Sequence, residues 1–189
     1  MRNASNAHKT EEFLEIYERH FAPIKDNKID MLEIGVQQGG SLDIWRNFFR
    51  GDFKLTGVDI LPSCEVYATN GVTIKIGDQA DPEFLATLGN YDIIIDDGGH
   101  KMSQQRTSFE HLFPKLNSGG IYVIEDLHTS YWGEFTDELP MTETLKTFVD
   151  DINAWATCPG NRSTQKSIIN KYDIASMHVY ESIVLIYKK

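Results

Sequence analysis

The sequence predicts an α/β fold in which a doubly wound, mostly parallel sheet ends in an antiparallel hairpin. Strand-like and helix-like segments alternate from residue 10 to residue 126, which is typical of a parallel sheet with helices on both faces. The strand-like segments are apolar almost throughout, as buried parallel strands are. The segment 174–189, IASMHVYESIVLIYKK, contains two strand-like runs joined tightly at Glu181 and Ser182, and this pattern predicts the hairpin.

Each element follows from hydrophobic spacing and from turn residues. An amphipathic helix is predicted within residues 10–24, and Pro23 ends it. Its apolar face carries Phe13, Leu14, Tyr17 and Phe21. Parallel strands are predicted at 29–36, 53–59, 72–78, 91–97 and 119–126. The helices predicted between them occupy 39–50, 81–88 and 103–116. In the second of these, Asp81 is the expected N-cap because Pro82 suits the first helical position.

Composition indicates a globular protein of one domain. We expect a single domain over 1–189, with an N-terminal tail and helix at 1–28. A formal net charge of −10 disfavours nucleic acid and anionic membranes as partners, because both are bound mainly by Lys and Arg. No segment has the apolar run of a signal sequence or a membrane span. Cys64 and Cys158 form no zinc-type pair and no disulfide framework, so we expect a cytoplasmic protein with two incidental thiols.

The first strand-to-helix turn is a candidate ligand site. The run LEIGVQQGGS places Glu33, Gly35, Gly39 and Ser41 where doubly wound sheets bind their ligands. The glycine spacing differs from the G-x-G-x-x-G of a pyrophosphate turn, and Glu33 favours a ligand with a cationic end. Simple turn geometry is the alternative explanation for the two glycines.

Polar residues at the ends of the next two strands extend this site. Asp59 ends the second strand, where an acid can accept hydrogen bonds from both hydroxyls of a ribose. Asp78 and Gln79 end the third strand and are expected beside an adenine ring. The predicted ligand is therefore a nucleoside with a positively charged tail, and S-adenosylmethionine is such a molecule.

Acidic residues end two strands that we expect to be neighbours. YDIIIDDGGH contains Asp96 and Asp97, and YVIED contains Glu125 and Asp126. Neighbouring strands lie about 4.8 Å apart, so these carboxylates repel one another unless a cation neutralises them. Oxygen ligands without Cys favour Mg²⁺, Mn²⁺ or Ca²⁺ over zinc. We expect Asp97, Glu125 and Asp126 to hold the metal and His100 to act as general base. Asp96 is expected to hold loop backbone or the cofactor's amino group.

Five motifs resemble those of a known family. LEIGVQQGGSLDIW, GVDI, GDQAD, IIIDDGGH and YVIEDLHTSYW are similar to motifs of class I S-adenosylmethionine-dependent methyltransferases. More narrowly, they resemble the metal-dependent macrolide-sugar O-methyltransferases of the mycinamicin and macrocin type. The resemblance implies a Rossmann-like sheet of seven strands. It also implies Mg²⁺ (or Mn²⁺) at Asp97, Glu125 and Asp126, and a catalytic base at His100. The family's usual DDGSH is DDGGH here.

The expected function is methyl transfer from S-adenosylmethionine, aided by Mg²⁺, to a hydroxyl of a sugar or another vicinal diol. The acceptor is expected to be a small molecule or a glycan in natural-product or polysaccharide biosynthesis. Residues 127–140 are expected to form a lid, and a second long loop is predicted at 157–165. Tyr131, Trp132 and Phe135 offer flat surfaces for a sugar ring, with ordinary loop packing as the alternative.

Three other functions fit parts of the sequence. The first is a nucleotide-dependent oxidoreductase on a similar fold, against which the glycine spacing argues. The second is a non-catalytic S-adenosylmethionine-binding module, which would not need the acids and His100. A metal hydrolase is the third, and it would not need the turn at 33–41. Self-association as a homo-oligomer, with the N-terminal helix taking part, stays open.

Overall fold

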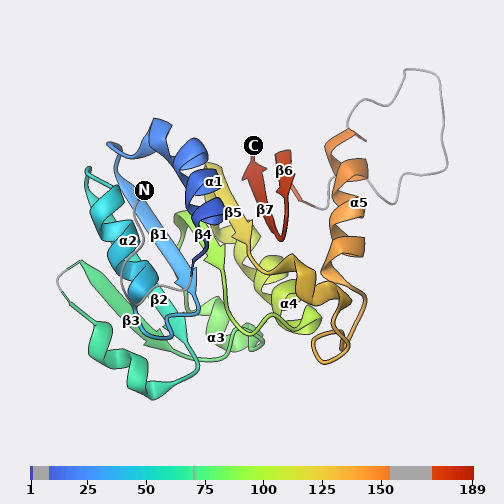
Figure 1. Ribbon diagram of the computed structural model, residues 1–189, viewed down its shortest axis with the longest axis horizontal. Helices are drawn as coiled ribbons and strands as arrows, with labels where there is room; N and C mark the ends of the chain where they lie inside the picture. The colour runs from blue at the N-terminus through green and yellow to red at the C-terminus, as the bar shows by residue number, and fades with distance from the viewer. Residues whose placement is uncertain (2–8, 70, 154–171) are drawn as a thin grey trace.

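A computed structural model describes residues 1, 9–69, 71–153 and 172–189 of the chain (Figure 1). Within these residues, seven strands form one sheet in the order β3-β2-β1-β4-β5-β7-β6. The strands are β1 Ile29–Ile34, β2 Phe53–Asp59, β3 Val72–Ile76, β4 Tyr91–Asp96, β5 Leu116–Ile124, β6 Ile174–Tyr180 and β7 Ile183–Lys188. β1 to β5 pair in parallel, whereas β7 is antiparallel to both β5 and β6. The predicted fold class is confirmed. Cys158 and the loop predicted at 157–165 lie outside the described residues.

Strand register brings the acidic strand ends together. β4 pairs with β5 so that Asp96 lies opposite Ile124. The next residues, Asp97 and Glu125, therefore leave the sheet side by side, and the Glu125 N–H donates to the Asp96 carbonyl at 3.0 Å. The neighbour relationship that the metal-site hypothesis requires is thus present.

The helices divide between the two faces of the sheet. The α-helices are α1 Glu11–Phe21, α2 Gly40–Phe48, α3 Pro82–Ala86, α4 Met102–Leu112 and α5 Met141–Asn153. Short 3-10 helices are η1 Ala22–Ile24, η2 Pro62–Tyr67, η3 Phe113–Lys115 and η4 Leu127–Tyr131. α1 and α2 pack on one face with the buried residues of a shared core, and α3, α4 and α5 pack on the other. The sequence analysis predicted α1 to α4 but not α5.

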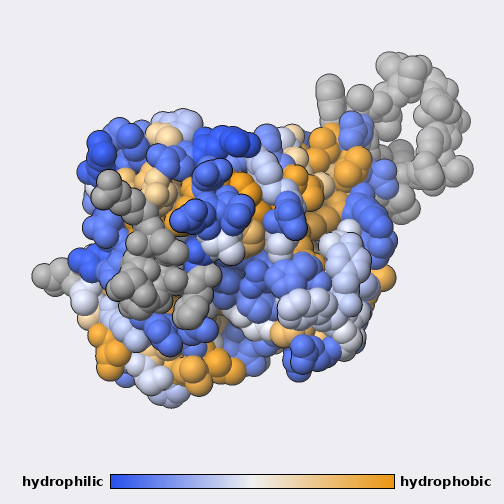
Figure 2. Space-filling model, in the orientation of Figure 1, coloured by the Kyte–Doolittle hydropathy of each residue, from blue (hydrophilic) through white to orange (hydrophobic). Residues whose placement is uncertain are grey.

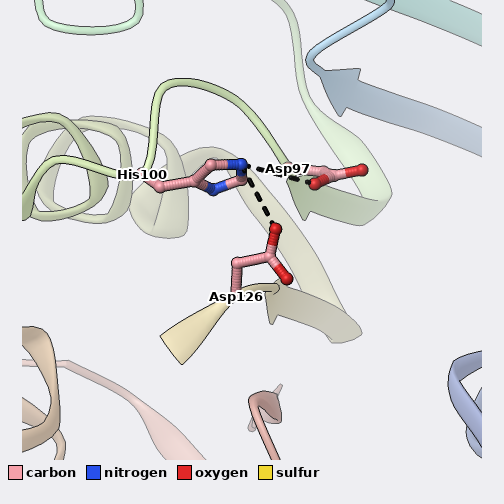
Figure 3. Close-up of side chains that lie close together, drawn as sticks. All are labelled: Asp97, His100 and Asp126. Carbon is pink, nitrogen blue, oxygen red and sulfur yellow. Dashed lines mark ion pairs between the residues drawn. The ribbon is translucent and has the colours of Figure 1, made fainter. Parts of the chain in front are cut away.

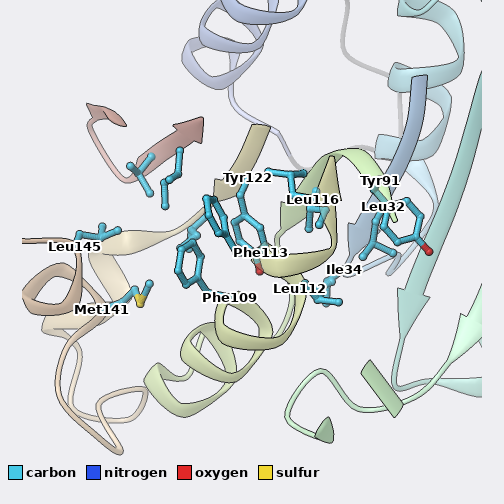
Figure 4. Packing of buried hydrophobic residues seen from close by; sticks show 14 of the residues in the cluster. Leu32, Ile34, Tyr91, Phe109, Leu112, Phe113, Leu116, Tyr122, Met141 and Leu145 are labelled. Carbon is cyan, nitrogen blue, oxygen red and sulfur yellow. The ribbon is translucent and has the colours of Figure 1, made fainter. Parts of the chain in front are cut away.

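Aromatic side chains fill the core on both faces. On the α4 side, Phe109 stacks on Phe113 with ring centroids 4.8 Å apart and meets Tyr122 edge-on at 5.1 Å (Figure 4). On the α1 side, Tyr17 packs edge-on against Trp45 at 4.9 Å. Burial of such rings contributes about 1.5–3 kcal/mol each, which fixes α1 firmly on the sheet. The position of α1 matters because its N-terminus reaches the carboxyl ends of the strands.

The described surface is mostly hydrophilic on the face shown in Figure 2. An exception follows β2, where Ile60, Leu61 and Val66 expose more than half of their surface. Hydrophobic patches lie over this segment in Figure 2. No described helix is long and apolar enough to cross a membrane.

Candidate active site

A cavity of about 430 Å³ opens at the carboxyl ends of β1 to β5. Nine of the predicted site residues line it: Gly35, Ser41, Asp59, Asp78, Gln79, Asp97, His100, Glu125 and Asp126. The other three, Glu33, Gly39 and Asp96, lie immediately behind its wall. The nucleoside-type site and the acidic site, which the sequence suggested separately, therefore share one cavity.

Two glycines shape the turn after β1. Gly35 has a φ of 95°, and a Cβ at this position would lie 2.0 Å from the Asp97 carbonyl oxygen. Gly39, at the N-cap of α2, has a φ of 72° and lies against the Tyr67 ring. Both backbone conformations favour glycine. The β1 turn can therefore touch the loop after β4, which closes the floor of the cavity.

Glu33 stands behind this turn and is fully buried. The Ser41 hydroxyl, which lines the cavity, donates to Glu33 Oε2 at 2.8 Å. Burial raises the pKa of Glu33, although Lys9 and the Ser41 hydrogen bond oppose the shift. Ser41 thus presents the Glu33 carboxylate to the cavity indirectly.

Asp59 is held at the rim of the cavity by backbone groups. Its Oδ2 accepts from the N–H groups of Val36 and Gln37, and its Oδ1 accepts from Leu61, each at 2.9 Å. Burial works against the charge, but these three hydrogen bonds outweigh it and lower the pKa of Asp59. The carboxylate is therefore fixed and ionised at the place where the sequence predicted a ribose contact.

The exposed apolar segment after β2 adjoins this carboxylate. Ile60 and Leu61 line the same cavity. After the neighbouring strand β3, Asp78 Oδ1 accepts from the Ala80 N–H at 2.8 Å, which shapes the loop there. Sequence reasoning missed Ile60 and Leu61, although two apolar residues directly after a strand-ending acid were a usable signal.

Gln79 and Asp96 form a buried polar network under the loop after β4. Gln79 Nε2 donates to Asp96 Oδ1 at 3.0 Å and to Ser108 Oγ at 3.1 Å. Its Oε1 accepts from the Gly99 N–H at 2.6 Å. Burial raises the pKa of Asp96 to about 7. Asp96 therefore supports the loop backbone through Gln79, which is one of its two predicted roles, and contact with a cofactor's amino group stays a prediction.

Asp97, His100 and Asp126 form a cluster that can hold a metal ion (Figure 3). His100 Nε2 lies 3.3 Å from Asp126 Oδ2 and 3.9 Å from Asp97 Oδ1. One ligand atom from each residue lies within 4.8 Å of the others. The two carboxylates are oxygen donors that suit Mg²⁺ or Mn²⁺, and a divalent cation would offset the repulsion between the acids, with the imidazole beside it. The side chains present therefore fit such an ion.

Glu125, the third predicted ligand, contacts the ammonium group of Lys9. Lys9 Nζ lies 2.5 Å from Glu125 Oε1, 2.8 Å from Asp97 Oδ2 and 3.6 Å from Glu33 Oε1. The Tyr17 hydroxyl also donates to Glu125 Oε1. Burial raises the pKa of Glu125, the Asp97 carboxylate adds to this, and Lys9 opposes it. Burial also disfavours the charge on Lys9, but Glu125, Asp97 and Glu33 outweigh it and raise the pKa of the ammonium.

Lys9 and Tyr17 are site residues that sequence reasoning missed. Lys9 is a single lysine in a polar tail, and nothing in its neighbourhood marks it as functional. Tyr17 was predicted on the buried face of its helix, and it is fully buried there, with only its hydroxyl reaching the site. Contacts of this kind depend on how α1 packs against the sheet.

Aromatic residues stand beside the acidic end of the cavity. Phe135 meets the His100 ring edge-on with centroids 6.4 Å apart. Trp132 meets His128 at 4.7 Å and remains 48% exposed, and Tyr131 is 76% exposed. Tyr131 ends η4 and Trp132 follows it, so both exposed rings belong to the segment 127–140.

Comparison with known proteins identifies homologues of this chain. The mycinamicin VI 2''-O-methyltransferase of Micromonospora griseorubida is 36% identical over 191 residues, which cover 91% of this chain and 47% of the relative. The 8-demethyl-8-alpha-L-rhamnosyl tetracenomycin-C 2'-O-methyltransferase of Streptomyces olivaceus is 34% identical over 205 residues, which cover 100% of this chain and 53% of the relative. The chain thus spans about half the length of the curated relatives it matches. No family model matches it.

A solved structure agrees with these relatives. The MycE methyltransferase from the mycinamycin biosynthetic pathway, in complex with Mg, SAH and mycinamycin VI, superposes with a TM-score of 0.82 at 31% identity. The match covers 97% of this chain and 50% of that chain. The chain is therefore a homologue of the sugar O-methyltransferases of natural-product pathways, and its fold is that of the class I S-adenosylmethionine-dependent methyltransferases.

Proposed function

We propose that the chain is an S-adenosylmethionine- and Mg²⁺-dependent O-methyltransferase that acts on a hydroxyl of a sugar or another vicinal diol. The observation that carries this proposal is one cavity with Asp59 at one end and the Asp97–His100–Asp126 cluster at the other. The homologous sugar O-methyltransferases support the class of acceptor. The homologous structure with Mg and SAH supports the two ligands.

The wall around the β1 turn suits the methyl donor. Asp59, fixed by three backbone N–H groups, accepts hydrogen bonds from the ribose hydroxyls. Ile60 and Leu61 offer apolar surface to the adenine ring, with Asp78 and Gln79 across the cavity. The Ser41–Glu33 pair faces the cationic end of the donor.

The acidic end of the cavity suits the acceptor. Asp97 and Asp126 would hold the metal, with Glu125 as the third carboxylate. Mg²⁺, when bound, supplies a Lewis acid that lowers the pKa of a bound hydroxyl. His100 takes the hydroxyl proton, because its Nε2 lies beside Asp97 and Asp126, where the acceptor hydroxyl would lie. Such a base contributes roughly 10²–10⁴-fold to the rate. The Thr129 hydroxyl, which donates to the His100 carbonyl at 3.3 Å, keeps this loop in place.

The segment 127–140 completes the proposed site as a lid over the acceptor. Phe135 contacts His100, Trp132 contacts Phe135, and Tyr131 exposes its ring in the same segment. Aromatic faces pack well against sugar rings. We further propose that residues 1–189 act as one methyltransferase domain, since its cofactor and metal groups all come from one sheet and its helices.

A turnover assay on chelator-treated protein tests the proposal. Methyl transfer from S-adenosylmethionine to a panel of glycosides and vicinal diols would be measured by mass spectrometry, with and without Mg²⁺. We expect product only with Mg²⁺, and none from Asp97→Asn, which should still bind SAH in calorimetry. Asp43→Asn, a change at an exposed aspartate on α2, is the matched control and should behave as wild type. SAH binding without metal-dependent product would instead favour the non-catalytic module.

A further inference from the structure

Lys9 occupies an unusual position between the two proposed ligand sites. Its side chain is almost fully buried, and its ammonium contacts Asp97 and Glu125, both proposed metal ligands. The same ammonium lies 3.6 Å from Glu33, which belongs to the cofactor end. A buried ammonium is costly unless carboxylates compensate it, and here three carboxylates surround it.

The contacts of Lys9 use oxygen atoms that a metal would need. Lys9 is bonded to Asp97 Oδ2 and to Glu125 Oε1, and Glu125 Oε1 also accepts from Tyr17. The residues whose ligand atoms lie within 4.8 Å of one another are Asp97, His100 and Asp126, without Glu125. Glu125 Oε1 can contact a cation only when Lys9 gives up this ion pair.

Glu33 offers the Lys9 ammonium a second binding position beside the one at Glu125. Glu33 Oε1 is buried and accepts no well-aligned hydrogen bond within the described part of the chain. Lysine has a flexible stem of four carbons, so a small change of its torsion angles carries Nζ from Glu125 to Glu33. Thr10 directly follows Lys9, and its hydroxyl accepts from the Phe13 N–H as the cap of α1. The backbone beside Lys9 is therefore held in place, and only the lysine side chain needs to move.

We propose that Lys9 is a positioning residue of the metal site: its ammonium is the resident counterion of the Asp97–Glu125 pair, and a divalent cation binds by displacing it toward Glu33. This inference rests on the proposed metal site. Lys9 therefore couples the two ends of the cavity, because its ammonium leaves Asp97 and Glu125 at the metal site and moves to Glu33 at the cofactor site. Lys9 lowers the apparent affinity for the metal because each binding event must break its ion pair.

Calorimetric titration of chelator-treated protein with Mg²⁺, without methyl donor or acceptor, tests this directly. Lys9→Met should bind Mg²⁺ about tenfold more tightly than wild type, which corresponds to about 1.4 kcal/mol. Lys54→Met removes the same charge from an exposed position on β2 and should leave the affinity unchanged. Unchanged or weaker binding by Lys9→Met would overturn the inference.

A double-mutant cycle separates displacement from simple charge effects. Glu33→Gln removes the carboxylate that would receive the displaced ammonium, so it should weaken Mg²⁺ binding in the wild-type background. In the Lys9→Met background the same change should have a much smaller effect, because no ammonium needs a new partner. Equal weakening in both backgrounds would mean that Glu33 acts on the metal only through its charge, and displacement would be rejected.

A crystal structure of the wild-type protein with Mg²⁺ gives an independent answer and does not depend on folding of the variants. Lys9 Nζ should lie within hydrogen-bond distance of Glu33 and no longer contact Glu125 Oε1. An unchanged Lys9–Glu125 contact in the loaded protein would overturn the inference. If wild type and every variant fail to bind Mg²⁺, the proposed metal site itself fails together with this inference.

Discussion

His100 and Asp126 both adopt left-handed backbone conformations, with φ values of 59° and 55°. Such a conformation costs a non-glycine residue about 1–2 kcal/mol. Neighbouring contacts hold the two residues in it: the Thr129 hydroxyl shares its single hydrogen between the Asp126 carbonyl at 2.7 Å and the His100 carbonyl at 3.3 Å. Strain that the surroundings maintain at a strand end is a feature of functional sites. In this conformation the His100 ring lies between Asp126, at 3.3 Å, and Asp97, at 3.9 Å.

Replacing His100 by alanine tests its role as the base. We expect kcat to fall by roughly 10²–10⁴-fold, because the hydroxyl proton loses its acceptor. Affinities for SAH and Mg²⁺, measured by calorimetry, should be unchanged. The exposed His111 on α4 provides the matched control, His111→Ala. A large loss of Mg²⁺ affinity in His100→Ala would instead identify His100 as a metal ligand.

The location of single residues in the cavity was predictable where it follows from a position at a strand end. Asp59, Asp97 and Asp126 end or directly follow apolar strands, and parallel pairing brings such positions to one edge of the sheet. Lys9 could not be found in this way. Its contacts span 88 residues to Asp97 and 116 to Glu125, so they depend on the packing of α1. The orientation of Glu125 toward Lys9 follows from the same packing.

At the scale of elements, the β1 turn and the loop after β4 are joined backbone to backbone. The Asp97 N–H donates to the Ile34 carbonyl at 3.0 Å, while the Gly35 N–H donates to the Val58 carbonyl of β2 on the other side at 2.8 Å. These bonds continue the sheet pattern beyond the strands. The absence of a side chain at Gly35 allows the two segments to approach, and this contact places Asp97 at the cavity floor.

Gly35→Ala should therefore destabilise the protein for two reasons, which Gly119→Ala can separate. Both glycines have positive φ, but an added Cβ meets nothing within 4 Å at Gly119. Conformational strain alone, about 1–2 kcal/mol, is expected for Gly119→Ala. The clash with the Asp97 carbonyl should cost Gly35→Ala roughly 1–3 kcal/mol more. Urea denaturation measures both, and equal losses would show that the contact relaxes without cost.

The strands and most helices were predictable because hydrophobic period and turn residues are local signals. The strand bounds agree within a few residues, and the Asp81 N-cap is confirmed by its bond to the Glu83 N–H at 2.9 Å. α5 was missed although Met141, Leu145 and Phe148 repeat at helical spacing. Its signal follows a long irregular segment and no strand, so the alternation that revealed the other helices did not reveal this one.

At the scale of the whole molecule, α1 joins the first part of the chain to the last. His20 Nδ1 lies 2.6 Å from the Tyr187 hydroxyl, and Nε2 lies 2.8 Å from the Tyr180 hydroxyl. These tyrosines come from β7 and β6, at the end of the sheet that the antiparallel hairpin forms. α1 also carries Tyr17 and follows Lys9, so the packing of the hairpin and the acidic end of the cavity depend on the same helix.

This junction should make stability depend on pH. Burial lowers the pKa of His20, and the neighbouring His178 and Arg19 lower it further. Tyr180 and Tyr187 are the other titratable groups that face it. The unfolded chain, with a histidine pKa near 6.5, binds more protons than the folded one just below this pH. The contribution of His20 is therefore complete above about pH 6.5 and is lost as the pH falls toward its folded pKa.

His20→Gln isolates this contribution because glutamine can still hydrogen-bond to the tyrosines but does not titrate. The free energy of unfolding would be measured by urea denaturation at several values between about pH 5 and 7.5. We expect wild type to lose stability more steeply toward low pH than His20→Gln, while the exposed-site control His111→Gln keeps the wild-type slope. Other acids that titrate here, such as Asp96, affect all three proteins alike and cancel in the difference. Equal slopes for wild type and His20→Gln would mean that His20 binds its proton equally in the folded and unfolded chains, and that the junction of α1 with the hairpin does not respond to pH.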